Sequence, residues 1–184
     1  LYELLELDLA AYPPAGIAKL DLSIAFKNDA PVVFGNITLD QGALQMPDGT
    51  MNVSRLKAAI NINYDHKGVG IPEYTLSGRV DEQVDFALQG KSTVYDFESG
   101  RLRIPNTTLS SEGNTLKLAG VLDPKDASQT LRVTADGIRL ESLKPCYALF
   151  APDLLPMKLG GIVKPDLTLA LGPEGAYDCK GTIA

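Results

Sequence analysis

The sequence predicts an all-β fold with a minor α-helical part: an elongated antiparallel sheet of repeated hairpins, curled into a trough or a half-open sandwich. Three observations predict it. Apolar and polar residues alternate along most of the 184 residues, turn-forming clusters separate the alternating runs, and one short segment repeats. Alternation of this kind is typical of antiparallel sheets, because these can bury one face and expose the other.

The repeated segment reads LDQGALQMPD in its first copy and FESGRLRIPN in its second. After each glycine the apolar residues occupy alternate positions, so they share one face of an extended strand. We expect Gly42 and Gly100 to lie where the chain turns or bulges. We expect Pro47 and Pro105 to end the strand, because proline has no N–H to donate. Such repetition indicates a repeated structural unit rather than a catalytic loop.

A second pattern strengthens the prediction of hairpins. Glycine followed at the second position by a branched aliphatic residue recurs at Gly35, Gly78, Gly120 and Gly161, at intervals of about 42 residues, and again at Gly181. The sequence therefore predicts a series of similar units rather than one irregular fold.

The apolar positions of the alternating runs define the candidate functional surface. Polar residues such as Asp21, Asn61 and Lys117 occupy the positions between them. One face of the sheet is therefore expected to be apolar and the other polar and exposed to water. The candidate residues of an apolar lipid groove are Leu22, Ile24, Phe26, Leu44, Met46, Ile60, Ile62, Leu76, Val80, Phe86, Leu88, Leu102, Ile104, Leu116, Leu118, Leu131, Val133, Leu167 and Leu169.

We expect a single β-rich, repeat-like domain over residues 1–184, with 141–184 as a candidate terminal sub-region. The start within a patterned segment is typical of a fragment of a longer protein. One short helix is predicted near 142–150, where Ser142 can cap a helix that Pro152 stops.

Charge and residue inventory argue against several classes of function. The 17 Lys and Arg against 23 Asp and Glu give a net charge of −6, which opposes binding to nucleic acid or to anionic membrane surfaces. The single histidine, His66, lies in a polar turn and is expected to be solvated. Asp81, Glu82 and Asp85 are expected to face water or to oppose Lys and Arg, with a calcium site as the less favoured alternative. We therefore expect no enzyme, no cofactor and no metal.

The two cysteines, Cys146 and Cys179, are too few for a disulfide scaffold and lack the spacing of a metal site. They are either two buried thiols or one bridge, and the sequence leaves both open. In an exported protein a bridge would close a loop of 33 residues (179 − 146). The chain-entropy model assigns such a loop roughly 3 to 4 kcal/mol of stabilisation.

Three segments resemble the AsmA-like family. They read ITLDQGALQMPDGTMNVSRLKAAININ, TLKLAGVLDPKDASQTLRVTADGIRLESLKP and KLGGIVKPDLTLALGPEGAYDCKGTIA, and they cover most of the chain. The shared features are spacings of glycine and aliphatic residues. The resemblance implies a bacterial envelope protein anchored in the inner membrane, with a β-rich region on the periplasmic side and a role in outer-membrane biogenesis and phospholipid movement. Related TamB-like and chorein-like proteins form an open trough lined with aliphatic side chains.

Two functions follow from these expectations. The leading hypothesis is a non-catalytic periplasmic module that binds or conducts phospholipid acyl chains in its apolar groove, with other envelope proteins as further partners. The alternative is a closed β-sandwich that acts as a structural or protein-interaction domain of the cell envelope. They differ in whether the apolar face is open, because an apolar face must be covered by a second sheet, a helix or a ligand.

Overall fold

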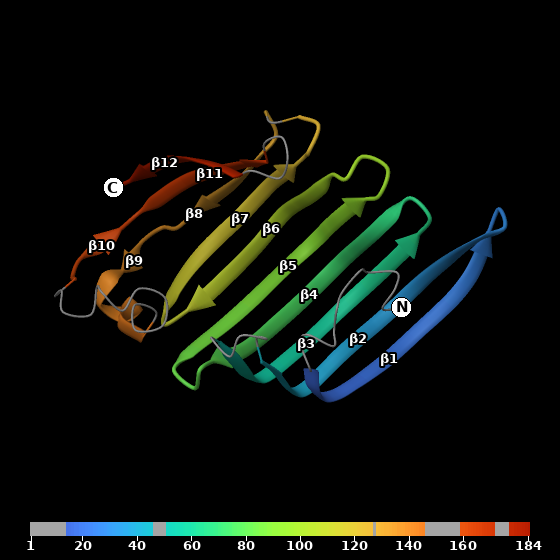
Figure 1. The fold of residues 1–184 in the computed structure, drawn as a ribbon, viewed down its shortest axis with the longest axis horizontal. Helices are drawn as coiled ribbons and strands as arrows, with labels where there is room; N and C mark the ends of the chain where they lie inside the picture. Colours follow the sequence, from blue (N-terminus) through green and yellow to red (C-terminus); the bar gives the residue numbers. More distant parts are fainter. Residues whose placement is uncertain (1–13, 46–50, 127, 146–158, 172–176) are drawn as a thin grey trace.

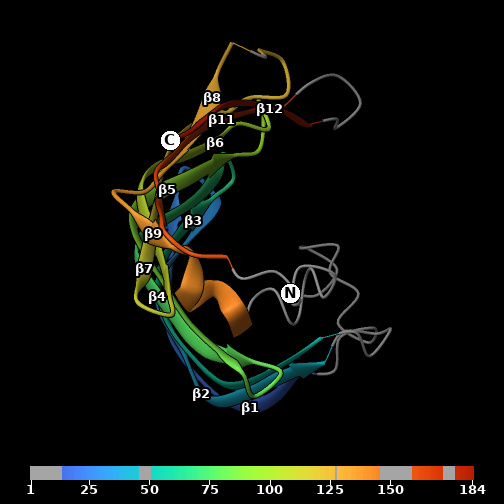
Figure 2. The same ribbon diagram turned by 90° about the vertical axis from the view of Figure 1, so that its left-hand side faces the viewer.

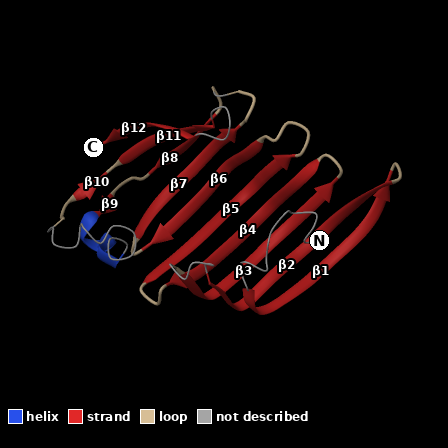
Figure 3. Cartoon of the chain, viewed as in Figure 1, coloured by secondary structure: helices blue, strands red, loops and turns tan. Residues whose placement is uncertain are grey.

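Ten strands form one antiparallel sheet in the computed structural model, which describes residues 14–45, 51–126, 128–145, 159–171 and 177–184 (Figure 1). Strands make up nearly all of the regular structure in these ranges, as Figure 3 shows. The strands are β1 (Pro14–Lys27), β2 (Ala30–Gln45), β3 (Asn52–Asp65), β4 (Gly68–Val80), β5 (Val84–Asp96), β6 (Leu102–Ser111), β7 (Asn114–Leu122), β8 (Thr130–Thr134), β9 (Ile138–Arg139), β10 (Ile162–Val163), β11 (Pro165–Leu171) and β12 (Tyr177–Ile183).

The sheet is a meander in which each strand pairs with its neighbours in the chain. Its order is β1-β2-β3-β4-β5-β6-β7-β8-β11-β12, and every pair is antiparallel. Between β8 and β11 the chain forms the small β9–β10 pair and a 3-10 turn, η1 (Leu140–Leu143). The prediction of an antiparallel sheet of repeated hairpins is confirmed.

The sheet curves strongly but does not close. Figure 2 shows the strands bending around a concave side, with η1 on that side. β1 and β12 form the two edges of the sheet and are not paired with each other. The predicted trough is therefore the observed shape.

Strands β4, β5 and β6 each carry one extra residue at the same level of the sheet. Strict alternation would expose one residue at a time, yet two consecutive residues are exposed at 72–73, 91–92 and 105–106. The register sets these sites side by side, and the ladders to β3 and β7 are shifted opposite them. Because all three strands carry the same insertion, residues paired beyond it still share a face. The apolar side chains therefore stay on the same side of the sheet on both sides of the insertion.

The expectation that Pro105 ends its strand is wrong. Pro105 lies inside β6, which continues to Ser111, and its missing N–H falls where the ladder to β7 is already interrupted. Gly100 has a φ of 72° in the turn before β6, whereas Gly42 lies within β2 at a register shift. The two glycines thus occupy a turn and a bulge, as expected, but the two decamers have different structures. Pro47 lies outside the described residues.

The helix predicted near 142–150 begins earlier, as the 3-10 turn η1. Ser142 does not cap it: the Ser142 hydroxyl donates a hydrogen bond of 2.7 Å to the carbonyl oxygen of Arg139, one turn back. Residues 146–150 lie outside the described residues. The polar side chain therefore stabilises the inside of the turn rather than its start.

Three glycines of the recurring glycine pattern share one geometry. Gly35, Gly120 and Gly181 have φ values of 151°, 147° and 157°, and each faces a leucine of the neighbouring strand. A Cβ atom at any of these positions would overlap a backbone carbonyl oxygen of that strand. Glycine is required there because two backbones approach closely.

This close approach can be tested by comparing two glycines. Replacing Gly120 with alanine should lower the free energy of unfolding by about 2 to 3 kcal/mol, because the new methyl group forces the strands apart in addition to straining φ. Gly113→Ala is the matched control: its φ is 75°, but nothing lies within 4 Å of the added atom. The control should lose only about 1 kcal/mol, the cost of the left-handed backbone alone. Urea unfolding followed by circular dichroism measures both, and equal losses would contradict the close-approach argument.

Candidate functional site

Cross-strand pairing places the predicted groove residues on one face of the sheet. One row of successively paired residues contains Ile60, Leu118, Val133 and Leu167. The neighbouring rows follow the same register. The candidates that the structure places on this face are Leu22, Ile24, Phe26, Leu44, Ile60, Ile62, Leu76, Val80, Phe86, Leu88, Leu102, Ile104, Leu116, Leu118, Leu131, Val133, Leu167 and Leu169.

This apolar face is the concave one. Asn114 belongs to it, because Asn114 pairs with Ser111, which pairs with Phe86. The Asn114 side chain donates a hydrogen bond of 2.7 Å to the Ser142 hydroxyl and accepts one of 2.8 Å from the backbone N–H of Arg139. It therefore fastens η1, which Figure 2 shows on the inside of the curve.

The concave face is half-buried rather than enclosed. In the part of the chain that the structure describes, the buried apolar residues are Val84, Leu131 and Ala135, and no large side chain is fully buried. Most groove candidates on β3 to β7 are intermediate in exposure, and those on the edge strand β1 are exposed. A closed core would bury such residues almost completely. Within the described residues, the face is thus not enclosed by a second layer.

Two aromatic rings of this face lie across glycines. Tyr74 reaches over Gly90, and its hydroxyl makes a hydrogen bond of 2.5 Å with the Thr107 hydroxyl, two strands away. In the same way the Phe86 ring covers Gly78. Sequence reasoning missed Tyr74 and Thr107 as residues of this face. The signal was present, because a glycine opposite an aromatic residue leaves space for the ring to lie flat.

A cluster of aromatic rings lines the rim where the β3–β4 and β5–β6 turns lie. The Phe97 ring centroid is 5.9 Å from that of Tyr64 and 5.7 Å from that of Tyr95. Phe97 is 45% exposed, although these contacts are of the tilted and edge-to-face type that stabilises aromatic pairs. Sequence reasoning missed this cluster, because Phe97 follows the end of β5 and breaks the alternation there.

Two candidates lie outside the described residues, namely Met46 and Cys146. Cys179 is exposed on β12, opposite Leu169, and so belongs to the concave face. The expectation of a buried thiol is wrong for Cys179, and the alternative of a bridge to Cys146, which lies outside the described residues, stays a prediction.

Many charged residues of the convex face form cross-strand ion pairs. Arg79 holds Asp85 through two hydrogen bonds of 2.7 and 2.6 Å, and Arg132 holds Asp166 through two of 2.7 and 2.5 Å. The hydrogen bonds from each arginine lower the pKa of its aspartate. These ion pairs contribute little stability individually, because both carboxylates are exposed to water.

The remaining carboxylates of the predicted acidic group also have local partners. Glu82 accepts a hydrogen bond of 2.5 Å from the Ser54 hydroxyl and lies 3.5 Å from the Arg55 guanidinium. Asp81 accepts a hydrogen bond of 2.7 Å from the backbone N–H of Asn52. No group of three or more His, Cys, Asp or Glu with metal-binding geometry occurs among the described residues.

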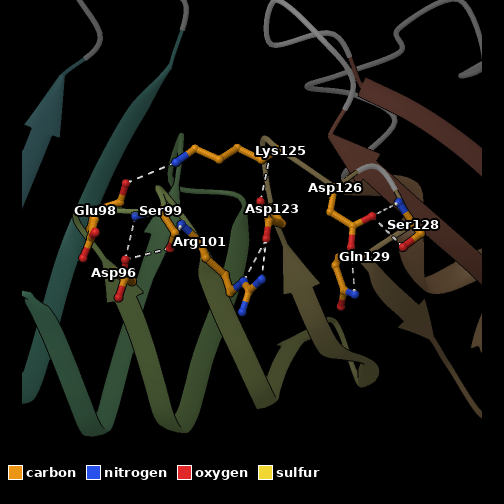
Figure 4. A network of polar contacts seen from close by, with 9 residues as sticks. All are labelled: Asp96, Glu98, Ser99, Arg101, Asp123, Lys125, Asp126, Ser128 and Gln129. Atoms are coloured by element: carbon orange, nitrogen blue, oxygen red, sulfur yellow. Dashed lines mark hydrogen bonds and ion pairs between the residues drawn. The ribbon is translucent and has the colours of Figure 1, made fainter.

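A polar network joins the β5–β6 turn to the loop between β7 and β8 (Figure 4). At its centre Asp123, only 3% exposed, accepts hydrogen bonds from the backbone N–H of Lys125 and from the Arg101 guanidinium. These bonds, the one from Lys125 foremost, lower the pKa of Asp123. Asp96 and Asp126 close the adjoining turns by accepting from Ser99 and Ser128. The network holds the strand ends along this rim.

Among the hollows of the described surface are two shallow ones, with volumes of about 330 and 290 Å³. Glu73, Lys91 and Asn106 line the first, beside the three-strand insertion, and Val32 and Val94 are among the residues that line the second. Neither is lined by a predicted groove residue. The candidate site is therefore the broad concave surface itself and not an enclosed pocket.

Within the described ranges, no helix is long and apolar enough to cross a membrane. Comparison of the chain with protein-family models, with curated proteins and with solved structures finds no match. The case for function therefore depends on the concave face and on the sequence pattern.

The buried Asp123 gives the fold a pH-dependent contribution. Its pKa is lower in the folded chain than the ordinary aspartate value of about 3.9. Its stabilising effect is therefore complete above about pH 4 and is lost as the pH falls through the lower, folded pKa. Asp123→Asn should lower the melting temperature at pH 7 by several degrees, and this difference should shrink below pH 4.

Glu98→Gln is the control for the loss of one charge, since Glu98 is exposed in the turn between β5 and β6. It should change the melting temperature far less. A difference between Asp123→Asn and the parent chain that stays constant from pH 7 to pH 3 would contradict the assignment. Thermal unfolding followed by circular dichroism measures all three chains.

Proposed function

We propose that this chain is a non-catalytic module that binds or conducts the acyl chains of phospholipids, or of other acyl-chain lipids, on its concave face. The observation that carries the proposal is a largely apolar, uncharged face, mostly half-buried, on the inside of a curved single-layer sheet. Large apolar surfaces exposed to water are rare on monomeric proteins. Each CH₂ group buried against such a surface gains about 0.8 kcal/mol.

The distribution of charge supports hydrocarbon as the ligand. In the described strands of the large sheet, the register places the charged residues on the convex face or at the insertions, and the concave positions hold aliphatic, aromatic, small or uncharged polar residues. Aliphatic rows without charge suit acyl chains and offer little to a phosphate headgroup or to a charged peptide. A headgroup would then remain in water at the open side.

We further propose that the chain is the periplasmic part of an AsmA-like protein whose parent is anchored in the bacterial inner membrane. Support comes from the resemblance of three long segments to that family, and from an open curled sheet of the kind the resemblance implies. On this proposal the chain takes part in outer-membrane biogenesis and phospholipid transport, with other envelope proteins as further partners.

Lipid content is the direct test. The chain purified without detergent should carry phospholipid, detected by native mass spectrometry and by extraction into organic solvent. A protein that is repeatedly free of lipid, and that does not take up phospholipid from vesicles, would contradict the proposal. That outcome would favour the alternative, a structural or protein-interaction domain of the envelope.

A charge placed in the trough should separate binding from folding. Phe86 is half-buried on the concave face, so its replacement by glutamate puts a carboxylate among the acyl chains while leaving it a path to water. Phe86→Glu should fold, with a stability loss of about 1 to 3 kcal/mol from lost apolar burial. Its lipid content should fall several-fold.

The matched control is Ala87→Glu, because Ala87 is the next residue of β5 and is exposed on the convex face. The Ala87→Glu variant should keep the fold and the lipid content of the parent chain. Circular dichroism and lipid content are measured on the same samples. Unfolding of both Phe86→Glu and Leu88→Glu would indicate a closed core and would contradict the open trough.

A further inference from the structure

The outer edge of β1 is a long unpaired strand edge. Among the described residues, β2 alone pairs with the 14-residue β1. The concave-side residues Leu20, Ile24 and Phe26 are 63%, 67% and 76% exposed, whereas their partners on β2 are mostly half-buried. Among the described residues no strand lies beyond β1, and this accounts for the greater exposure of the β1 side chains. Exposed backbone N–H and C=O groups on such an edge are a template for pairing with another strand.

The sequence of β1 lacks the usual protection of an edge. Residues 17–27 contain no proline, and the three charges, Lys19, Asp21 and Lys27, all lie on the convex face. Inward-pointing charges and prolines are the devices by which natural edge strands avoid pairing. These three charged groups also take part in no ion pair within the described residues, unlike most charges of the convex face.

We propose that two copies of this chain pair through their β1 edges, antiparallel and about a two-fold axis at Ile24. Such an axis, perpendicular to the sheet, keeps both concave faces on the same side. The two ten-stranded sheets then form one continuous sheet with a longer trough. The pairing does not require the proposed lipid binding, because the backbone edge and the convex charges carry it and the concave residues Leu22 and Phe26 only add to it.

Charge favours this register over most of its neighbours. With the axis at Ile24, Asp21 of each copy lies opposite Lys27 of the other, and Leu22 lies opposite Phe26. The two ion pairs and the two aliphatic–aromatic pairs are both favourable across antiparallel strands.

Other positions of the two-fold axis along β1 give less favourable contacts between the two copies. An axis at Ser23 sets Lys19 opposite Lys27, and an axis at Asp21 sets that carboxylate opposite its own copy, so both place like charges together. An axis at Leu22 forms no ion pair. An axis at Leu20 pairs Lys19 with Asp21 but carries the ladder into the bulge between residues 15 and 17. A two-fold axis that passes between two residues of β1, rather than through one, would place apolar side chains opposite polar ones.

The other edge of the sheet fits a partner less well. β12 has 7 residues, and its two charges, Asp178 and Lys180, already pair with each other. Pairing of β12 with the β1 of a second copy would also leave a free edge at each end and grow into filaments, whereas the two-fold contact closes. A second copy seated on β1 is therefore the occupant that the charges favour.

The test is charge reversal followed by mixing. Sedimentation equilibrium of the whole chain at low salt and without detergent should show a monomer–dimer equilibrium. Asp21→Lys alone and Lys27→Asp alone each create two like-charge contacts, so each should weaken dimerisation at least tenfold. An equimolar mixture of the two variants should restore it, because each introduced charge then faces the opposite charge introduced in the other chain.

Controls keep the outcome interpretable. The chain carrying both substitutions should dimerise like the parent, and Lys180→Asp on the far edge should leave the dimer unchanged. Circular dichroism confirms the fold of each variant, which is expected because both substituted positions are exposed. A monomer at all concentrations, open-ended growth, single variants that dimerise normally, or a mixture that fails to recover would each overturn the proposal.

Discussion

The structure depends on one constraint: every strand must bend without rotating its apolar side chains out of the trough. Side chains alternate with a period of two, so one extra residue turns all that follow to the opposite face. A single-layer sheet has no second layer to compensate such an error. In β4, β5 and β6 the extra residue comes at the same level. There Ser92 of β5, with a φ of 55°, lies between Pro72 of β4 and Pro105 of β6. The insertion therefore bends the sheet while the apolar face continues across it.

The close contacts of the concave face follow from the same bending. Gly35, Gly120 and Gly181 remove the side chain where a neighbouring backbone would occupy its place. Gly78 and Gly90 instead leave room for an aromatic ring from the adjacent strand. Glycine thus has two roles in this sheet: it permits close approach of strands at some levels, and it lets large rings cover the backbone at others.

The sequence was sufficient to predict the face of most apolar residues but not the register. Alternation is a local property, so Leu76, Phe86 and Leu118 could be placed on one face from their neighbours alone. The expectation for Pro105 is wrong because a break in alternation looks the same whether a strand ends or carries an insertion. The difference lies in the adjacent strands, which a local pattern does not describe. The cap expected at Ser142 is wrong for a similar reason, since its hydroxyl donates to the carbonyl oxygen of Arg139 and accepts from Asn114 on the distant strand β7.

Ligand binding and stability are coupled in such a molecule. With few buried apolar residues among those described, the sheet is stabilised mainly by its hydrogen-bond ladders and by half-buried apolar rows, because exposed ion pairs contribute little. An acyl chain on the concave face would complete the burial of those rows in the folded chain only. A ligand that binds the folded state alone stabilises it by mass action. On the proposed function, the openness of the concave face would therefore make the stability of the fold depend on the ligand that covers that face.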